Sequence, residues 1–333
     1  MYEELIGYAR KIAREVDSYI YTIIRGKPKI LYDASIHLIK AGGKRLRPLL
    51  TALSCRVVGG DEKLAIPAGA AIEILHNFTL VHDDIIDKDE MRRGMPTVHK
   101  LWGVEMAILA GDLLFAKAYQ ALLGLRELGV SSERLIKAIE LLIWGSITVA
   151  EGQALDMEFE KRNDIRERDY LEMIEKKTAA LFITSAGIGS IVGGGDEGSI
   201  RALMEYAKYM GIAFQIRDDI LGLVGDEKAL GKPVLSDIRE GKKTILVIYA
   251  LSRLNEKERS KLLSILGNRQ ADLNSLREAA ELIKSTGAID YADKLAEEYI
   301  HRSVEALNKV DVKDQEALKL LKLLNSFVTK RRY

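Results

Sequence analysis

The chain has 333 residues, 47% of them hydrophobic and 30% charged, and a chain of this length can bury roughly 75% of its unfolded surface. Its 50 Lys and Arg residues balance 49 Asp and Glu residues, for a formal net charge of +1. No overall field therefore favours nucleic acid or an anionic membrane as a partner. The single cysteine, Cys55, excludes an internal disulfide and suits a reducing compartment.

The sequence also lacks the usual signals for export or membrane insertion. Its first residues, "MYEELIGYARKIAREV", contain no apolar core of a signal peptide, and no run of 18 consecutive apolar residues occurs. We therefore expect a cytoplasmic protein that binds no nucleic acid and does not insert stably into a membrane.

Helical periodicity dominates the chain. Apolar residues recur at i, i+3, i+4 and i+7 over residues 133–159 and 201–224, and no alternating strand pattern competes with them. Clusters of Gly, Asp, Asn and Ser mark loops at 57–63, 125–132, 192–199, 224–234 and 266–275. None of these loops is long enough for an inter-domain linker. We predict a single all-α domain over residues 1–333, built from about ten or more helices.

The segment "VHDDIID", residues 81–87, concentrates acidic side chains at the end of one predicted helix. On a helix Asp83 and Asp87 lie about 40° apart and Asp84 about 100° from Asp83, so three carboxylates fan over one turn. Such like charges repel each other unless a cation accompanies them. Mg²⁺ prefers oxygen ligands and suits this set. The alternative is a solvated acidic face, but a second pair returns in "IRDDILG" at 216–222.

Basic residues gather in four places: residues 41–48 ("AGGKRLRP"), 92–93, 175–182 and 230–244. Each alone reads most simply as a solvated charge run. Arg forks and Lys ammonium groups are nevertheless what diphosphates require, and adjacent glycines let backbone amides approach an anion. Two acidic platforms and several cationic clamps together indicate a substrate whose diphosphate is bridged by Mg²⁺.

These motifs resemble those of trans-isoprenyl diphosphate synthases of the archaeal geranylgeranyl type. The resemblance runs in order through "GGKRLRP", "HNFTLVHDDIIDKDEMRRGMPTVH", "GDLL", "EGQALDMEF", "KKTAALF" and "GIAFQIRDDILGLVGDEKALGKPVLSDIREGKKT". It implies the isoprenoid synthase fold, an antiparallel all-helical bundle around a central cavity. It also implies a homodimer or higher homo-oligomer, with the two Asp-rich motifs facing each other across the mouth of the cavity.

The resemblance also implies a role for individual residues. Metal binding is expected, with two to three Mg²⁺ per active site, from Asp83, Asp84, Asp87, Asp218 and Asp219. The expected isopentenyl diphosphate site comprises Gly43, Lys44, Arg47, His76 and Arg93. The expected allylic diphosphate site comprises Arg92, Lys177, Thr178, Gln215, Lys232 and Lys242. Lys177 and Lys232 join the first aspartate motif as expected catalytic residues. Gly222 departs from the family pattern, which has a third Asp there, so we expect at most two ligating carboxylates in the second motif.

The implied chemistry explains these residue types. Loss of diphosphate from an allylic carbon leaves a cation and a strongly negative leaving group, whose charge Mg²⁺ and the Lys/Arg clamp neutralise. The double bond of isopentenyl diphosphate then attacks the cation before water can, and a proton is lost. The departing diphosphate is the expected base. His76 and His82 are accordingly interpreted as hydrogen-bonding partners, with packing an equal alternative for His82.

Product length is expected to depend on the floor of an apolar pocket. In this family the residue five before the first Asp often sets that floor, and here it is Phe78, which favours a C20 product. An ideal wheel places Phe78 about 140° from Asp83, so it could equally be ordinary core. The alternatives are a farnesyl or longer-chain (C25 and above) synthase, a terpene cyclase and a non-catalytic regulatory subunit. "GGKRLRP" and Arg93 argue against a cyclase, and the complete first motif argues against a regulatory subunit.

Overall fold

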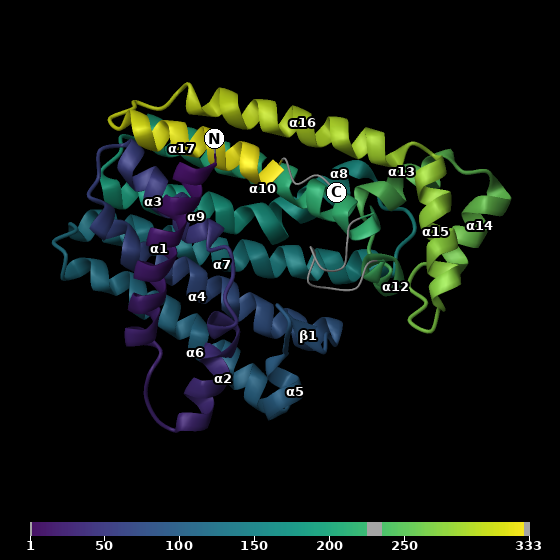
Figure 1. Cartoon of the computed structure of the whole chain (residues 1–333), viewed down its shortest axis with the longest axis horizontal. Helices are drawn as coiled ribbons and strands as arrows, with labels where there is room; N and C mark the ends of the chain where they lie inside the picture. Colours follow the sequence, from purple (N-terminus) through teal and green to yellow (C-terminus); the bar gives the residue numbers. More distant parts are fainter. Residues whose placement is uncertain (1, 225–234, 330–333) are drawn as a thin grey trace. The chain divides into compact units, whose positions relative to one another are not determined.

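The computed structural model describes residues 2–224 and 235–329, and this part of the chain is almost entirely helical. Up to residue 126 its helices are α1 (Glu3–Ile23), α2 (Lys29–Lys40), α3 (Leu46–Val57), α4 (Glu62–Asp87), α5 (Val98–Trp102), α6 (Val104–Leu123) and the 3₁₀ turn η1 (Gly124–Arg126). The middle of the chain forms α7 (Ser132–Glu160), α8 (Glu167–Ile174), the π-helical turn η2 (Glu175–Ala179), α9 (Ala180–Gly193) and α10 (Glu197–Val224). The remaining helices are α12 (Ser236–Glu240), α13 (Ile245–Arg253), α14 (Glu256–Ile265), α15 (Leu273–Ser285), α16 (Ala288–Leu307) and α17 (Gln315–Thr329). Figure 1 labels most of these elements.

The chain divides into two compact units. Unit 1 comprises residues 1–146, 181–207 and 304–327, and unit 2 comprises residues 147–180, 208–303 and 328–333. Each unit is assembled from stretches that are separate in the sequence. The single domain over residues 1–333 stays a prediction.

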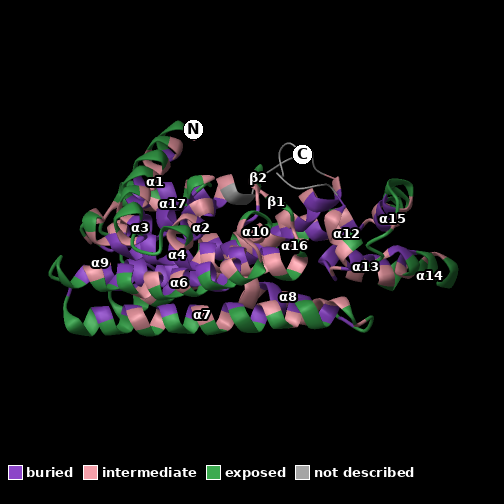
Figure 2. Cartoon of the chain, turned by 90° about the horizontal axis from the view of Figure 1, so that it is seen from below, coloured by how far each residue is buried: buried purple, intermediate pink, exposed green. Residues whose placement is uncertain are grey.

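The expected helices are present, and so are the expected loops that fall within the described residues. The loop expected at 224–234 lies outside them from residue 225 onward. α7 and α10 cover the two segments of strongest periodicity, and the loops around residues 58–61, 127–131 and 266–272 separate helices. In unit 1, α4 packs against α1, α3 and α6, and half of its 26 residues are buried (Figure 2). Gly69 allows close approach to α3, because a Cβ there would lie 3.1 Å from the Cα of Pro48. α4 is therefore the core helix of its unit.

Two helical stretches are long and apolar enough to cross a membrane by length and composition alone: residues 62–87 and residues 104–126. In the first, 67% of the most apolar window is buried inside the protein, whereas in the second 39% is buried. Burial accounts for the apolar character of α4. Part of α6 presents apolar side chains on the surface.

One short sheet was not expected from the sequence. β1 (Met91–Arg92) and β2 (Met95–Pro96) pair antiparallel, with Arg92 opposite Met95. The two residues between them have positive φ, +54° at Arg93 and +74° at Gly94, as a two-residue hairpin turn requires. Arg93 is held in this conformation by donating from Nη1 to the carbonyls of Leu38 (2.9 Å) and Gly42.

A buried guanidinium ties together several segments of unit 1. Arg45 Nε donates to Asp17 Oδ1 at 2.7 Å, and its Nη1 lies 3.1 Å from Glu73 Oε1. The same side chain donates to the carbonyls of Ile39 (2.8 Å) and Gly42 (3.0 Å). Arg45 is 3% exposed and Glu73 2%. The two carboxylates and two carbonyls thus satisfy a cation that would otherwise be costly to bury.

We expect Arg45→Ala to destabilise the protein by about 3–5 kcal/mol, because the buried Glu73 carboxylate would lose its counter-charge. Equilibrium unfolding in urea measures this loss. The matched control is Lys29→Ala, which breaks an exposed i,i+4 pair with Asp33 and should cost less than about 1 kcal/mol. Equal small losses in both variants would contradict the central role of Arg45.

Candidate functional site

The first acidic motif occupies the last turn of α4, in unit 1. α4 ends at Asp87, and Lys88 follows in the left-handed conformation with φ +62°. Asp83 and Asp87 are half-buried, whereas Asp84 is 1% exposed. Asp84 Oδ1 pairs with the Nε of Arg92, while Asp84 Oδ2 is buried without a partner among the described residues. Burial raises the pKa of Asp84 to about 6, although Arg92 opposes this.

Most of the residues expected to bind isopentenyl diphosphate lie together in unit 1. Gly42 and Gly43 have φ of +89° and +147°, and a Cβ on Gly43 would lie 3.1 Å from Arg93 Cζ. Burial, and then Arg47 and Arg93, hold the pKa of His76 well below its usual value, so the imidazole is neutral. The role of His76 as a hydrogen-bonding partner stays a prediction.

Arg47 lies at the centre of this electropositive region, which comprises Gly43, Arg47, His76 and Arg93. Its guanidinium stacks 4.7 Å from the ring centre of Phe182, and its buried Nε has no hydrogen-bond partner among the described residues. Burial, together with Arg93, lowers the pKa of Arg47 to about 10, which still leaves it charged near neutral pH. Lys44, the fifth expected residue, is exposed on the same loop.

In unit 2, hydrogen bonds link the second acidic motif to two residues of the expected allylic site. Thr178 Oγ1 donates to Gln215 Oε1 at 2.7 Å, and Gln215 Nε2 donates to Asp219 Oδ1 at 2.8 Å. The hydroxyl of Tyr170 donates to the other Asp219 oxygen, Oδ2, at 2.7 Å. Both oxygens of Asp219 thus accept from protein donors, and burial raises its pKa to about 8. Its neighbour Asp218 is half-buried.

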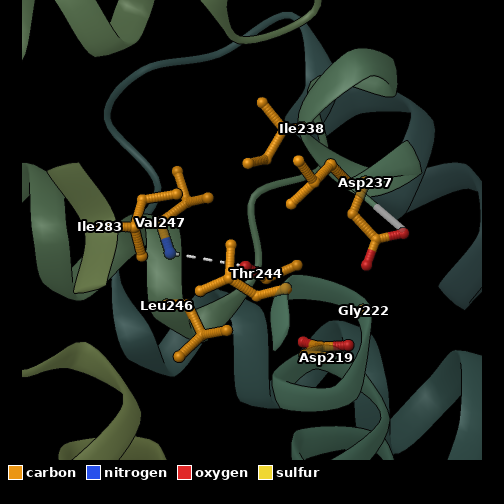
Figure 3. A pocket seen from close by; sticks show the side chains of 10 residues that line it. Asp219, Gly222, Asp237, Ile238, Thr244, Leu246, Val247 and Ile283 are labelled. Atoms are coloured by element: carbon orange, nitrogen blue, oxygen red, sulfur yellow. Dashed lines mark hydrogen bonds between the residues drawn. The ribbon is translucent and has the colours of Figure 1, made fainter. Parts of the chain in front are cut away.

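Another carboxylate, that of Asp237, lies close to Gly222, the position at which the family pattern has the third aspartate of the second acidic motif. A Cβ on Gly222 would lie 2.7 Å from Oδ2 of Asp237, which belongs to α12. Asp219, Gly222 and Asp237 line one pocket of unit 2, together with apolar side chains such as Leu246 and Ile283 (Figure 3). The absence of a side chain at Gly222 therefore leaves room for an acid from another helix.

Two of the expected allylic-site lysines share a carboxylate. Lys177 Nζ lies 2.6 Å from Asp156 Oδ2, and Lys242 Nζ lies 3.0 Å from the same oxygen. Lys242 also pairs with Glu160 at 2.6 Å. Lys232, the remaining lysine of this expected set, lies outside the described residues.

Phe78 packs in a row of aromatic side chains in unit 1. Its ring centre lies 5.3 Å from that of Phe115 in α6, which in turn lies 5.2 Å from Tyr119. On its other side the ring of His82 lies 4.8 Å away, against the backbone of Gly111. The packing role considered for His82 is therefore present, and so is a hydrogen-bonding contact, because its Nε2 lies 3.3 Å from the Ile108 carbonyl oxygen. Phe115 is 38% exposed, so the row reaches from α4 to the surface of α6.

The donor set is compatible with Mg²⁺ bound jointly with substrate. Within residues 2–224 and 235–329, no three carboxylate, imidazole or thiol groups converge closely enough to hold a metal ion by themselves. Mg²⁺ commonly uses only one or two carboxylates and completes its shell with water and substrate phosphates. The unpartnered, buried Oδ2 of Asp84 is the kind of oxygen that such an ion would satisfy.

Comparison with known proteins places the chain in a family. Residues 28–283 match the model of the polyprenyl synthetase family. The chain is also 50% identical over 327 residues to a geranylgeranyl diphosphate synthase from Sulfolobus acidocaldarius, covering 98% of both sequences. The chain belongs to the polyprenyl synthetase family. It is further similar, at 44% identity over 95% of its length and 99% of the relative, to a geranylfarnesyl diphosphate synthase from Aeropyrum pernix.

Solved structures of this family agree with the all-α prediction. A geranylgeranyl pyrophosphate synthetase from Pyrococcus horikoshii matches with a TM-score of 0.91 and 44% identity over 99% of both chains. A Corynebacterium glutamicum geranylgeranyl pyrophosphate synthase, solved with isoprenyl diphosphate and magnesium, matches with a TM-score of 0.89 at 28% identity. That match covers 98% of this chain and 99% of the other. The predicted isoprenoid synthase fold is confirmed.

Several residues of these sites were not singled out from the sequence. Asp156, Tyr170 and Asp237 each contact or adjoin an expected site residue through side-chain atoms. Asp156 and Asp237 do lie within the family-like motifs "EGQALDMEF" and "LSDIREGKKT", which is the one signal that could have drawn attention to them. Tyr170 lies in no such motif.

The raised pKa values of Asp84 and Asp219 predict how stability varies with pH in the absence of metal. Both folded-state values lie above the usual value of 3.8, at about 6 and about 8. Between about pH 4 and pH 8 these two carboxyl groups hold more protons in the folded chain than in the unfolded chain, so their contribution to stability falls as pH rises. The lowered pKa of His76 contributes in the opposite sense below about pH 6.5. We therefore expect the melting temperature of the metal-free protein to drop between about pH 6.5 and pH 8, where Asp219 titrates.

The variant Asp219→Asn removes the higher of the two titrations and should flatten the decline above about pH 6. Asp33→Asn, which alters an exposed pair with Lys29, should leave the profile unchanged. The same slope of melting temperature against pH in the wild-type protein and in Asp219→Asn would show that burial does not raise the pKa of Asp219.

Proposed function

We propose that the chain condenses isopentenyl diphosphate with C5 to C15 allylic diphosphates, giving mainly geranylgeranyl diphosphate (C20) and inorganic diphosphate. The observation that carries the proposal lies in unit 1. There the chain pairs an aspartate cluster, in which Asp84 has an unpartnered buried oxygen, with an electropositive region in which Arg47 has an unpartnered buried nitrogen. The aspartate cluster suits a cation, and the electropositive region suits an anion. Membership of the polyprenyl synthetase family supports the same substrates.

In this proposal the electropositive region binds isopentenyl diphosphate. In this proposal the guanidinium groups of Arg47 and Arg93 and the ammonium group of Lys44 face the diphosphate. The bare glycine backbone at Gly43 gives the anion close access. The neutral His76 donates or accepts one hydrogen bond without adding charge. Because a terpene cyclase needs no second diphosphate site, this region favours a synthase.

The allylic diphosphate is assigned to the two aspartate motifs and the remaining cations. Its proposed ligands are Arg92, Lys177, Thr178, Gln215, Lys232 and Lys242, with Mg²⁺ held by Asp83, Asp84, Asp87, Asp218 and Asp219. When bound, Mg²⁺ neutralises charge that develops on the departing diphosphate. Asp219 is already engaged by Tyr170 and Gln215, so Mg²⁺ at this carboxylate would compete with these two donors.

In the proposed reaction no side chain forms a covalent bond with the substrate. The bond between the allylic carbon and diphosphate breaks, and Lys177, Lys232 and Arg92 stabilise the negative leaving group. The double bond of isopentenyl diphosphate attacks the allylic cation, and the departing diphosphate takes the proton that is lost. The proposed reaction requires that water be kept from the cation, which it would otherwise capture.

Product length is assigned to Phe78. Its ring, backed edge-on by Phe115, offers an aromatic wall that a growing chain would meet. The relatives include both geranylgeranyl and geranylfarnesyl synthases, so the C20 product rests on this bulky ring. A farnesyl or C25 product is the alternative.

Three further features complete the proposal: two to three Mg²⁺ per active site, a cytoplasmic location and a homodimer. An apolar row on α6 supports the homodimer, because exposed apolar residues in such number are typical of interaction surfaces. The row comprises Val104, Ile108, Leu109, Phe115 and Leu123, and α7 adds Ile136, Ile143 and Trp144. The buried, reduced Cys55 is consistent with the cytoplasm.

Incubation of the pure protein with labelled isopentenyl diphosphate, Mg²⁺ and each of the C5, C10 and C15 primers tests the function directly. We expect a C20 alcohol after dephosphorylation. In the same assay Asp83→Ala should lower turnover by about 1,000-fold or more, because it removes a proposed metal ligand. A correctly folded Asp83→Ala variant within about tenfold of wild type would refute the metal assignment.

Substrate selectivity tests the placement of the two diphosphate sites. Arg47→Ala should raise the Michaelis constant for isopentenyl diphosphate by about tenfold or more, and that for the allylic primer far less, because it removes a contact to one diphosphate only. Steady-state kinetics with each substrate varied in turn measures the difference. Arg10→Ala, at an exposed position of α1, is the control. Equal increases for both substrates would mean that the two sites are wrongly assigned.

The third expected outcome concerns Phe78→Ala. If the ring ends chain growth, the variant should make C25 and longer products at the expense of C20. Because Phe78 is only half-buried, stability should fall by less than the roughly 3–5 kcal/mol typical of a fully buried ring.

Chromatography of the dephosphorylated alcohols reports the product lengths. Phe159→Ala, at a buried ring in the core of unit 2, is the matched control for destabilisation. An unchanged product pattern in Phe78→Ala, or the same shift in the control, would return Phe78 to ordinary core.

A further inference from the structure

A stripe on α7 faces the expected allylic-site lysines of unit 2. Gly152, Asp156 and Glu160 are spaced by four residues, so each lies about 40° further around the helix than the last. All three contact the segments that carry Lys177 and Lys242. The stripe therefore presents one continuous surface to side chains from two distant parts of the sequence.

Gly152 supports the backbone that carries Lys177. A Cβ at residue 152 would lie 2.2 Å from the Lys177 nitrogen and 2.6 Å from its Cα, too close for any side chain. Lys177 belongs to the π-helical turn η2, a local widening of the helix that often marks functional positions. The bare backbone at Gly152 thus lets this turn lie directly against α7.

One helical turn further on, Asp156 gathers the two ammonium groups. Its Oδ2 accepts from Lys177 Nζ at 2.6 Å and from Lys242 Nζ at 3.0 Å. The Asp156 side chain is 7% exposed, whereas that of Lys177 is 24% and that of Lys242 12%. The carboxylate is thus covered while the cations keep an accessible side. Burial alone would raise the pKa of Asp156, but the two lysines hold it below its usual value.

The geometry differs from that of an ordinary ion pair. Two cations converge on a single oxygen, although they would repel each other without it. Among the described residues, Asp156 is the one carboxylate that Lys177 pairs with, so an ammonium with three donors retains capacity for a second anion. Lys242 is in addition steadied by Glu160.

We propose that Asp156 is a positioning residue, which holds Lys177 and Lys242 side by side so that both can bind one diphosphate. This inference rests on the proposed function, because it takes the allylic diphosphate as the anion that the two lysines share. Asp156 itself does not touch the substrate; it acts through the two ammonium groups.

Titration calorimetry with inorganic pyrophosphate, in the absence of Mg²⁺, tests this role apart from catalysis. All proteins compared in the titration carry Arg47→Ala, which weakens the other proposed diphosphate site, so that the lysine site is the one observed. We expect Asp156→Asn to weaken pyrophosphate binding by about tenfold, because the lysines lose the charge that holds them together. Asp156→Glu retains that charge and should recover part of the affinity. The control is Glu151→Gln, which removes an exposed pair between α7 and Lys176 of the same π-helical turn and should change binding less than about twofold.

Kinetics supply a second readout that simple destabilisation would not produce. In Asp156→Asn the Michaelis constant for the allylic primer should rise about tenfold while that for isopentenyl diphosphate changes little. Pyrophosphate binding that is unchanged or tighter in Asp156→Asn would overturn the inference, since Asp156 would then be neutral or a competitor of the anion.

Lys177→Ala separates failure of this inference from failure of the proposed function. If Lys177→Ala binds pyrophosphate as the Arg47→Ala parent does, the assignment of Lys177 to a diphosphate site is wrong, and the positioning role falls with it. If Lys177→Ala loses affinity and Asp156→Asn does not, the diphosphate site stands and the role of Asp156 alone is refuted.

Should Asp156→Asn fail to fold, Asp156→Glu and Gly152→Ala carry the test. Both should weaken pyrophosphate binding by displacing Lys177, and unchanged affinity in both would refute the proposal.

Discussion

Unit 1 depends on the burial of one guanidinium, that of Arg45. The side chain joins Asp17 of α1 and Glu73 of α4 to the carbonyls of Ile39 and Gly42. The Gly42 carbonyl also accepts from Arg93 at the turn of the β1–β2 hairpin. The network thus fixes both the loop that carries Gly42 and Gly43 and the β1–β2 hairpin relative to α4. Because several arginines share this small volume, buried carboxylates are the condition under which the loop can keep its conformation.

The same rule recurs wherever the structure concentrates charge of one sign. Arg92 pairs with Asp84 beside the first acidic motif, and Asp156 pairs with two lysines in unit 2. Asp84, Lys177 and Lys242 are therefore matched with opposite charge within the protein. Asp219 is instead met by neutral donors, Tyr170 and Gln215. Binding of Mg²⁺ would exchange the partner of Asp84, whereas diphosphate would add a second anion to the two lysines that Asp156 holds. Neither event would have to create unpaired charge in a buried place. This explains how a folded chain can carry such clusters.

Apolar periodicity and loop-forming residues predicted the helices well, because both signals depend only on residues near each other in the sequence. α7 and α10 follow the apolar repeat closely, and α4 ends at Asp87 after the acidic turn. The β1–β2 hairpin escaped prediction because each strand has two residues, too few for an alternating pattern. Its turn, Arg93–Gly94, lacks the Asn or Asp that usually marks a hairpin. A contact with the Gly42 carbonyl, distant in sequence, holds Arg93 in the required conformation.

The sequence by itself determined the all-α class, the two acidic motifs, the basic segments and the resemblance to prenyl synthases, because each resides in a short run of residues. Tertiary structure alone decided which of these groups are buried and what each one touches. It buried Asp84 between two half-buried neighbours, engaged both oxygens of Asp219, and set Asp237 beside Gly222. Asp156 and Lys242 are 86 residues apart yet share a hydrogen bond. Burial and partnership of this kind arise when distant segments pack, and helical periodicity records only which face of a helix turns inward.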